Sequence, residues 1–136
     1  MKKFNFEIID GYRNNGQKIE QSIRYALTGE IVKADNLPAT VGADCNGYQI
    51  KSARATVCKG EKIDDCRIKI CFERCNGYIY GTLDGIGYIM TKEEYRDFVL
   101  KFGTVTRDST KNGGHAKIRF RHETEALREY LDERAE

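Results

Sequence analysis

Long apolar runs are missing from this sequence, and so are linker-like, repetitive and low-complexity stretches. No apolar run approaches the ~18 residues that a transmembrane helix needs, so no membrane span is predicted. The first ten residues reach an acidic residue before any long apolar stretch, which argues against a signal peptide. The chain has one proline and no tryptophan among 136 residues, and 40% of it is hydrophobic. We therefore expect one ordered domain spanning residues 1–136.

Charge imbalance and closely spaced cysteine pairs are missing too. The formal net charge is +2, so any role with nucleic acid must come from local clustering of basic residues. Five cysteines without a CxxC pair predict the reduced thiols of a cytoplasmic protein. Buried strand thiols are the commoner explanation, and a zinc site at Cys66, Cys71 and Cys75 is the alternative. His115 and His122 have no nearby nucleophilic Cys or Ser pattern, which argues against a hydrolase triad.

Asn-Gly occurs twice in the same four-residue sequence, CNGY, at positions 45–48 and 75–78. Asn-Gly between extended segments predicts a hairpin, because both central residues of a type I′ turn need positive φ. We therefore predict two hairpins, one turning at 46–47 and one at 76–77. Polar and apolar residues alternate on both sides of the second turn, which supports strands there.

Apolar residues at helical spacing predict three helices, at about 16–27, 91–102 and 124–134. Thr91 and Glu94 have the spacing of a capping box at the start of the second helix, and Gly103 ends it. Between the last two helices we predict a polar loop at 107–114 and a strand at 115–121. The expected order is helix, hairpin, hairpin, strand, helix, strand, helix, which is that of a mixed α/β (α+β) domain.

A two-residue turn at 46–47 would gather polar side chains on one face of the first hairpin. Counting outward from the turn pairs Asp44 with Gln49, and directly opposed residues point to the same face. Lys51 lies two residues further along and shares that face. A solvated edge strand would show the same pattern. Glu20, at the border of the first helix's apolar stripe, either pairs with Arg24 or faces this hairpin.

A helical Glu, then an Asp, then an acid-or-amide-x-Lys on the next strand resembles the PD-(D/E)xK nuclease superfamily. The residues that carry the resemblance are Glu20, Asp44, Gln49 and Lys51. The layout is similar to that of archaeal Holliday-junction resolvases and restriction-type endonucleases, and it covers about residues 17–52. Ala43 stands where the motif has proline, and Gln49 replaces the usual acid. Some branches of the superfamily also carry Gln-x-Lys and are active nucleases. Asp35 is a rival for the Asp position.

The resemblance implies a restriction-endonuclease-like core, with a central mixed β-sheet flanked by helices, and metal-dependent hydrolysis of DNA phosphodiesters. Mg²⁺ or Mn²⁺ would be held by Asp44, the Gln49 side chain and the Ile50 main-chain carbonyl, with Glu20 bound directly or through water. The ion would activate a water and neutralise charge on the pentavalent state. Lys51 would position or deprotonate that water, or stabilise the developing charge. Since one such site cuts one strand, the family resemblance is compatible with a homodimer.

The predicted strand at 115–121 alternates between basic and apolar residues, which places its basic residues on one face. Together with the preceding loop, these residues predict contact with DNA, namely Lys111, His115, Lys117, Arg119 and Arg121. The alternative is a solvated face balanced by the acidic last helix. For the whole chain, the rival to a nuclease is a non-catalytic phage or mobile-element protein of the same fold that binds DNA or a host protein. Gln49 favours that rival.

Overall fold

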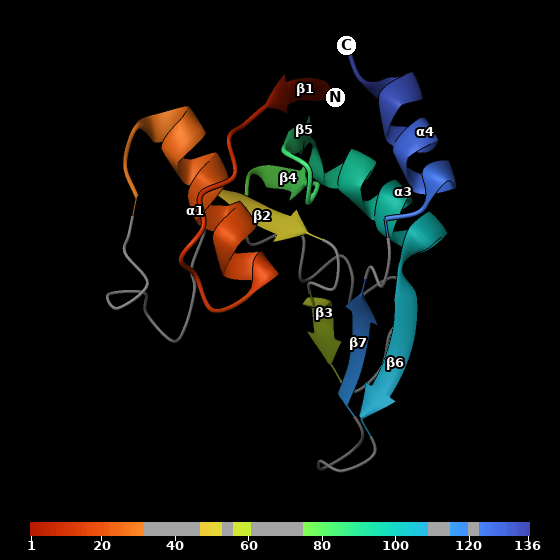
Figure 1. Cartoon of the computed structure of the whole chain (residues 1–136). Helices are drawn as coiled ribbons and strands as arrows, with labels where there is room; N and C mark the ends of the chain where they lie inside the picture. Colours follow the sequence, from red (N-terminus) through yellow and green to blue (C-terminus); the bar gives the residue numbers. More distant parts are fainter. Residues whose placement is uncertain (32–46, 53–55, 61–74, 109–114, 120–122) are drawn as a thin grey trace.

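The computed structural model describes residues 1–31, 47–52, 56–60, 75–108, 115–119 and 123–136, which form two β-sheets and three α-helices (Figure 1). Along the chain the elements are β1 (Lys2–Asn5), α1 (Asn15–Thr28), β2 (Tyr48–Ser52), β3 (Thr56–Gly60), β4 (Gly77–Gly81), β5 (Ile86–Met90), α3 (Lys92–Phe102), β6 (Thr104–Asp108), β7 (His115–Arg119) and α4 (Glu125–Arg134).

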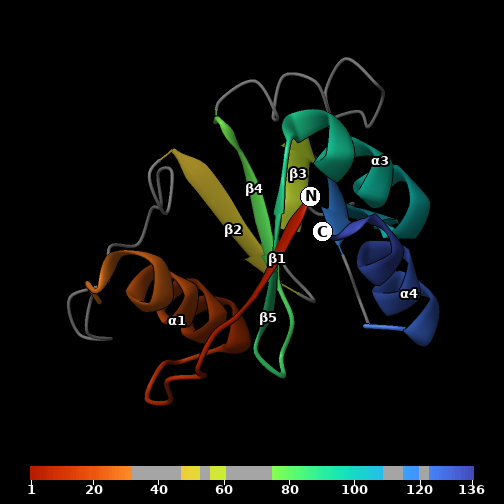
Figure 2. The same ribbon diagram turned by 90° about the horizontal axis from the view of Figure 1, so that it is seen from above.

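The larger sheet has four strands in the order β1-β5-β4-β2. β4 and β5 are antiparallel, as are β1 and β5, whereas β2 runs parallel to β4. Figure 2 shows α1 on one face of this sheet and α3 with α4 on the other. The structure therefore confirms the predicted mixed α+β class, with a mixed sheet flanked by helices.

α1 begins and ends at residues suited to helix termini. The side chain of its N-cap residue, Asn14, accepts the backbone N–H of Gln17 at 2.8 Å, which satisfies one of the unpaired donors of the first turn. Gly29 follows the last helical residue in the left-handed region, with φ of 74°, where a side chain would be strained. The predicted helix at about 16–27 is confirmed.

One stripe of α1 packs against the four-stranded sheet. Ile19 and Ile23 are almost fully buried and form a hydrophobic cluster with Ile50 of β2 and Ile79 of β4. Burial of such a side chain contributes about 1.5–3 kcal/mol, so these residues dominate the docking of the helix. The contact is close: a Cβ added to Gly81 would overlap the methyl groups of both α1 isoleucines.

The other face of the sheet packs against α3 and α4. Its cluster is aromatic at the centre, where Tyr80 meets Phe98 of α3 edge-on at 5.2 Å between ring centroids. Leu127 and Leu131 of α4 are also buried in it. Both predicted helices are confirmed, and so is the capping box of α3. The Thr91 hydroxyl accepts a hydrogen bond from the backbone N–H of Glu94. In return, the Glu94 carboxylate accepts one from the backbone N–H of Thr91.

The smaller sheet has three antiparallel strands in the order β3-β7-β6 and lies beyond the β2 edge of the larger sheet (Figure 1). The predicted strand at 115–121 is confirmed over His115–Arg119, where it is the central strand. The sequence analysis missed β6. Its alternating residues Thr104, Val105 and Thr106 carry a strand signal, because β-branched residues favour extended backbone.

The predicted hairpin at 76–77 is wrong. β4 begins at Gly77, and β2 and β5 occupy its two edges, so no edge remains for a hairpin partner. Gly77 also lacks the positive φ that a type I′ turn requires. At the first Asn-Gly, Gly47 does have a positive φ of 85°, but the strand predicted before it lies outside the described residues. The backbone N–H of Asn76 donates to the Gly47 carbonyl at 2.8 Å, so these two residues lie side by side.

Candidate functional site

β2 carries two of the predicted site residues on one face. Ile50 faces α1, so alternation along the strand places Gln49 and Lys51 on the opposite face. These two residues stand in register with Tyr78 and Tyr80 of β4, which are buried on the side of α3. Both Gln49 and Lys51 are half-buried. The amide and the ammonium group therefore share a surface at the last strand of the described sheet.

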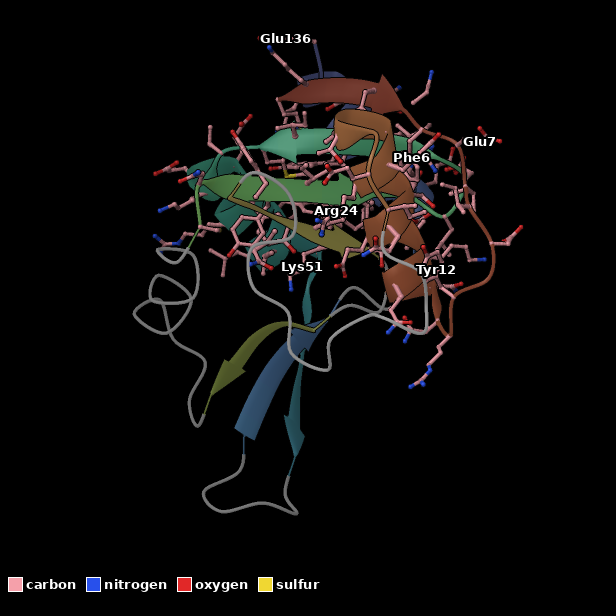
Figure 3. The ribbon with its side chains drawn as sticks, turned by 90° about the vertical axis from the view of Figure 1, so that its left-hand side faces the viewer. Phe6, Glu7, Tyr12, Arg24, Lys51 and Glu136 are labelled. Carbon is pink, nitrogen blue, oxygen red and sulfur yellow. The ribbon has the colours of Figure 1, made fainter. Side chains whose placement is uncertain are left out.

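Lys51 lies where the larger sheet meets the smaller one. Figure 3 shows it at the β2 margin of the four-stranded sheet, on the side of the three-stranded sheet. The chain continues from Ser52, the last residue of β2, to Thr56, the first residue of β3. Lys51 is thus close in sequence and in space to the sheet that contains the basic strand β7.

Glu20 lies on the other side of the sheet. It follows the buried Ile19 on α1 and is itself half-buried. α1 packs on the Ile50 face, so the helix that carries Glu20 lies on the face of the sheet opposite to Gln49 and Lys51. A cation shared by these three residues would have to lie at the outer edge of β2. The Ile50 main-chain carbonyl lies in the plane of the sheet, between the two faces.

Asp44, the predicted charged ligand, lies outside the described residues, as do its rival Asp35 and the zinc candidates Cys66 and Cys71. Within the part of the chain that the structure describes, no three His, Cys, Asp or Glu side chains cluster closely enough to hold a metal ion. Cys75 is buried and forms no disulfide bond. A metal site at β2 would thus need an acidic ligand from outside the described residues, and Asp44 remains the predicted one.

Three of the predicted DNA-binding residues alternate along β7, namely His115, Lys117 and Arg119. Lys111 and Arg121 lie outside the described residues. Among the acids of the last helix, Asp132 accepts hydrogen bonds from Lys3 of β1 at 2.9 Å and from the Tyr88 hydroxyl of β5 at 2.6 Å. This carboxylate is bound to the larger sheet.

A polar cluster between α4 and the β4–β5 turn was missed in the sequence. Glu123 accepts hydrogen bonds from the backbone N–H of Leu83 at 3.0 Å and from the Tyr80 hydroxyl at 3.4 Å. Arg128 reaches Asp84 at 3.2 Å and Glu123 at 4.0 Å. Burial raises the pKa of Glu123. No local pattern reveals this cluster, because its two halves are about forty residues apart in the sequence.

α4 is also held to the larger sheet near its C-terminal end, through Asp132. Hydrogen bonds from Tyr88 and then Lys3 lower the pKa of Asp132, while burial and the bond to Asp132 raise that of Tyr88 to about 12. The hydrogen bond from Thr82 lowers the pKa of Asp84. These carboxylates already accept donors from the protein, so the cluster fastens α4 to the sheet.

A hollow of about 590 Å³ opens at the end of the sheet where β2 and β4 begin. Its lining is mainly apolar and includes Leu27, Tyr48, Ile79 and Ile89. Neither Glu20 nor the Gln49–Lys51 pair lines it. The hollow is thus separate from the candidate site.

Comparisons of the chain with protein-family models, with curated proteins and with solved structures found no match. Among the described helices, none is long and apolar enough to cross a membrane.

Proposed function

We propose that the chain is a metal-dependent DNA endonuclease with a restriction-endonuclease-like core, whose site forms at the outer edge of β2. The observation that carries the proposal is the shared face of Gln49 and Lys51 at that edge, directly before the chain enters the sheet of the basic strand. The mixed sheet with helices on both faces agrees with the coarse architecture of such enzymes.

The residues at this edge fit a hard divalent cation. Asp44, the Gln49 amide oxygen and the Ile50 carbonyl are oxygen donors, which Mg²⁺ and Mn²⁺ prefer. When bound, the ion would lower the pKa of a water and neutralise charge on the phosphodiester. Asp44 would supply the negative charge that Gln49 lacks, with Glu20 reaching the site around the edge of β2. Lys51 would orient the attacking water or stabilise charge on the phosphate oxygens.

A non-catalytic DNA-binding protein of the same fold is the second candidate. Two observations favour it: the helix that carries Glu20 lies on the face of the sheet opposite to Lys51, and Gln49 contributes no charge to a metal site. Such a protein would contact DNA through Lys51 and the basic strand β7 and would not hydrolyse the DNA backbone.

Incubation of the purified protein with supercoiled plasmid, in Mg²⁺, Mn²⁺ or EDTA, tests the two candidates. The nuclease proposal expects nicking in either metal and none in EDTA. Asp44→Ala should abolish nicking while leaving the circular dichroism spectrum and Tm unchanged. Gln49→Glu should keep or raise activity, since it restores a carboxylate. Asp97→Ala, which removes an exposed acid of α3, is the matched control and should behave as wild type.

The outcomes separate the candidates. DNA binding without nicking in either metal would establish the non-catalytic alternative. Nicking that survives Asp44→Ala would show that the site lies elsewhere. Resolution of nicked from linear product would also report on pairing of two copies, because a homodimer brings two sites to one duplex.

A further inference from the structure

β1 is an edge strand of the larger sheet, and its backbone groups alternate between β5 and the outer edge. The backbone N–H of Phe6, the residue after the strand, donates to the Gly85 carbonyl at 2.9 Å. In an antiparallel pair every second residue exchanges hydrogen bonds with its opposite residue, so the even-numbered residues of β1 bond to β5. The backbone N–H and C=O groups of Lys3 and Asn5 therefore point outward, away from the sheet.

Two further hydrogen bonds agree with this direction. The Met1 carbonyl, two residues before Lys3, accepts the backbone N–H of Glu136 at 3.0 Å, so it points to the outer edge. Ile86, which stands opposite Asn5, directs its carbonyl to the other side of β5. Among the described residues, no backbone hydrogen bond reaches the outward groups of Lys3 or Asn5.

This outer edge is accessible in the part of the chain that the structure describes. Figure 1 shows β1 as the uppermost strand, and Figure 2, which looks down on it, shows α1 and α4 to its two sides. Lys2, Lys3 and Asn5 are exposed, and Phe4 is half-buried. A strand edge with unbonded N–H and C=O groups is a template for a further strand.

The residues of β1 suit pairing with the same strand of a second copy, antiparallel about a twofold axis. One register opposes Lys3 with Lys3 of the second copy, where like charges repel and the Met1 carbonyl is already bound. Another opposes Asn5 with Asn5 and overlaps the two strands by a single residue. The third opposes Lys3 with Asn5 and Phe4 with Phe4. In this register no lysine faces a lysine, and two outward residues of each strand are paired.

We infer that two copies of the chain associate by antiparallel pairing of β1, with Phe4 at the twofold axis and Lys3 opposite Asn5. Each Lys3–Asn5 pair would exchange both N–H···O bonds. Phe4 lies on the α1 face beside Phe6, at 6.1 Å between ring centroids, and an aromatic pair across two strands adds stability. The larger sheets of both copies would become continuous, with β2 at each outer end. The inference does not depend on the proposed nuclease activity.

The first test is the mass of the full chain in solution, measured by light scattering during gel filtration over a series of concentrations. The wild type should approach twice the 15.6 kDa of one chain. Asn5→Pro removes an outward N–H and keeps every β1–β5 bond, which a proline on an edge strand allows. Since the dimer would lose two hydrogen bonds, its Kd should rise about 5- to 150-fold. Asn5→Ala retains the N–H and is the matched control.

The second test fixes the register by oxidative cross-linking on a non-reducing gel. Phe4→Cys places two thiols directly opposite each other at the axis, within the Cα separation that a disulfide bridges. It should give a covalent dimer that the wild type, oxidised in parallel, does not give. Lys2→Cys is the matched control, because Lys2 would stand opposite Phe6 of the second copy and its thiols would lie too far apart.

The outcomes are decisive in both directions. A wild-type chain that stays monomeric at about 1 mM would overturn the inference, since the association would be too weak to matter. A dimer that Asn5→Pro leaves as tight as the wild type, at an unchanged Tm, would place the interface elsewhere and overturn it too. If Asn5→Pro does not fold, the cross-linking decides: a dimer from Phe4→Cys alone supports the pairing, and its absence or equal yields from both variants refute it.

Discussion

Replacing Gly81 with alanine should displace α1 from the sheet and destabilise the protein by about 1–3 kcal/mol. A Cβ on Gly81 would lie 2.6 Å from Ile23 Cδ1 and closer still to Ile19 Cγ2. Carbon atoms in good contact are ~3.5–4.0 Å apart, so the helix or its side chains must move. Both isoleucines are buried almost completely, at 1% and 0% exposure, which leaves them little room. For a chain of this length, the Tm should fall by roughly 3–12 °C.

Urea unfolding followed by circular dichroism gives the free energy of unfolding for a double-mutant cycle. Ile23→Val removes the Cδ1 methyl group and alone should cost about 0.5–1.5 kcal/mol. Combined with Gly81→Ala it should cost less, because it opens space for the new methyl, and the coupling should exceed about 0.5 kcal/mol. Gly29→Ala is the control. Its added Cβ meets nothing within 4 Å, so only its positive φ of 74° should cost stability, with no coupling to Ile23→Val.

Additive effects of Gly81→Ala and Ile23→Val would refute this reasoning. They would mean that α1 does not pack on β4 as described, and the placement of the helix that carries Glu20 on the face opposite to Lys51 would then lose its basis.

Two further predictions concern the helix ends and acid stability. Thr91→Ala removes half of the capping box of α3 and should cost about 1 kcal/mol in urea unfolding, whereas Thr91→Ser should cost little; equal stability of all three proteins would contradict the cap. The pKa of Asp132 is lowered below its ordinary value of 3.8 in the fold, so its stabilising contribution is present above that value and is lost as pH falls through the folded pKa. Asp132→Asn should therefore lower the Tm at neutral pH, and the difference from wild type should shrink in acid below 3.8. A difference that is constant with pH would assign the effect to packing.

The helices were predictable because their signals are local. The cap at Thr91, the glycine after α1 and the apolar stripes all lie within a few residues of what they control. Strand pairing is different. Asn-Gly is a local preference for a turn, but all five residues of β4 are buried, and such a strand gains most from a neighbour at each edge. The partner it finds in β2 is distant in the sequence, so no local pattern predicts it.

In the candidate site, too, the local features were predictable from the sequence and the long-range packing was not. Alternation along one strand suffices to place Gln49 and Lys51 on a common face. Which face α1 covers depends on the packing of Ile19 and Ile23 against the sheet, and a helical Glu beside them could have belonged to either side.

The two sheets are interleaved along the chain. β3 lies between β2 and β4 in the sequence, and β6 and β7 lie between α3 and α4, so neither sheet is a continuous segment. The β4–β5 hairpin can form early, because its strands are neighbours in sequence, whereas β2 must close a long crossover that includes β3 before it pairs. The strand that carries Lys51 should thus be among the last to join the larger sheet during folding. A single proteolytic cut between α3 and β6 would leave all four strands of the larger sheet on one fragment but would separate β3 from β6 and β7.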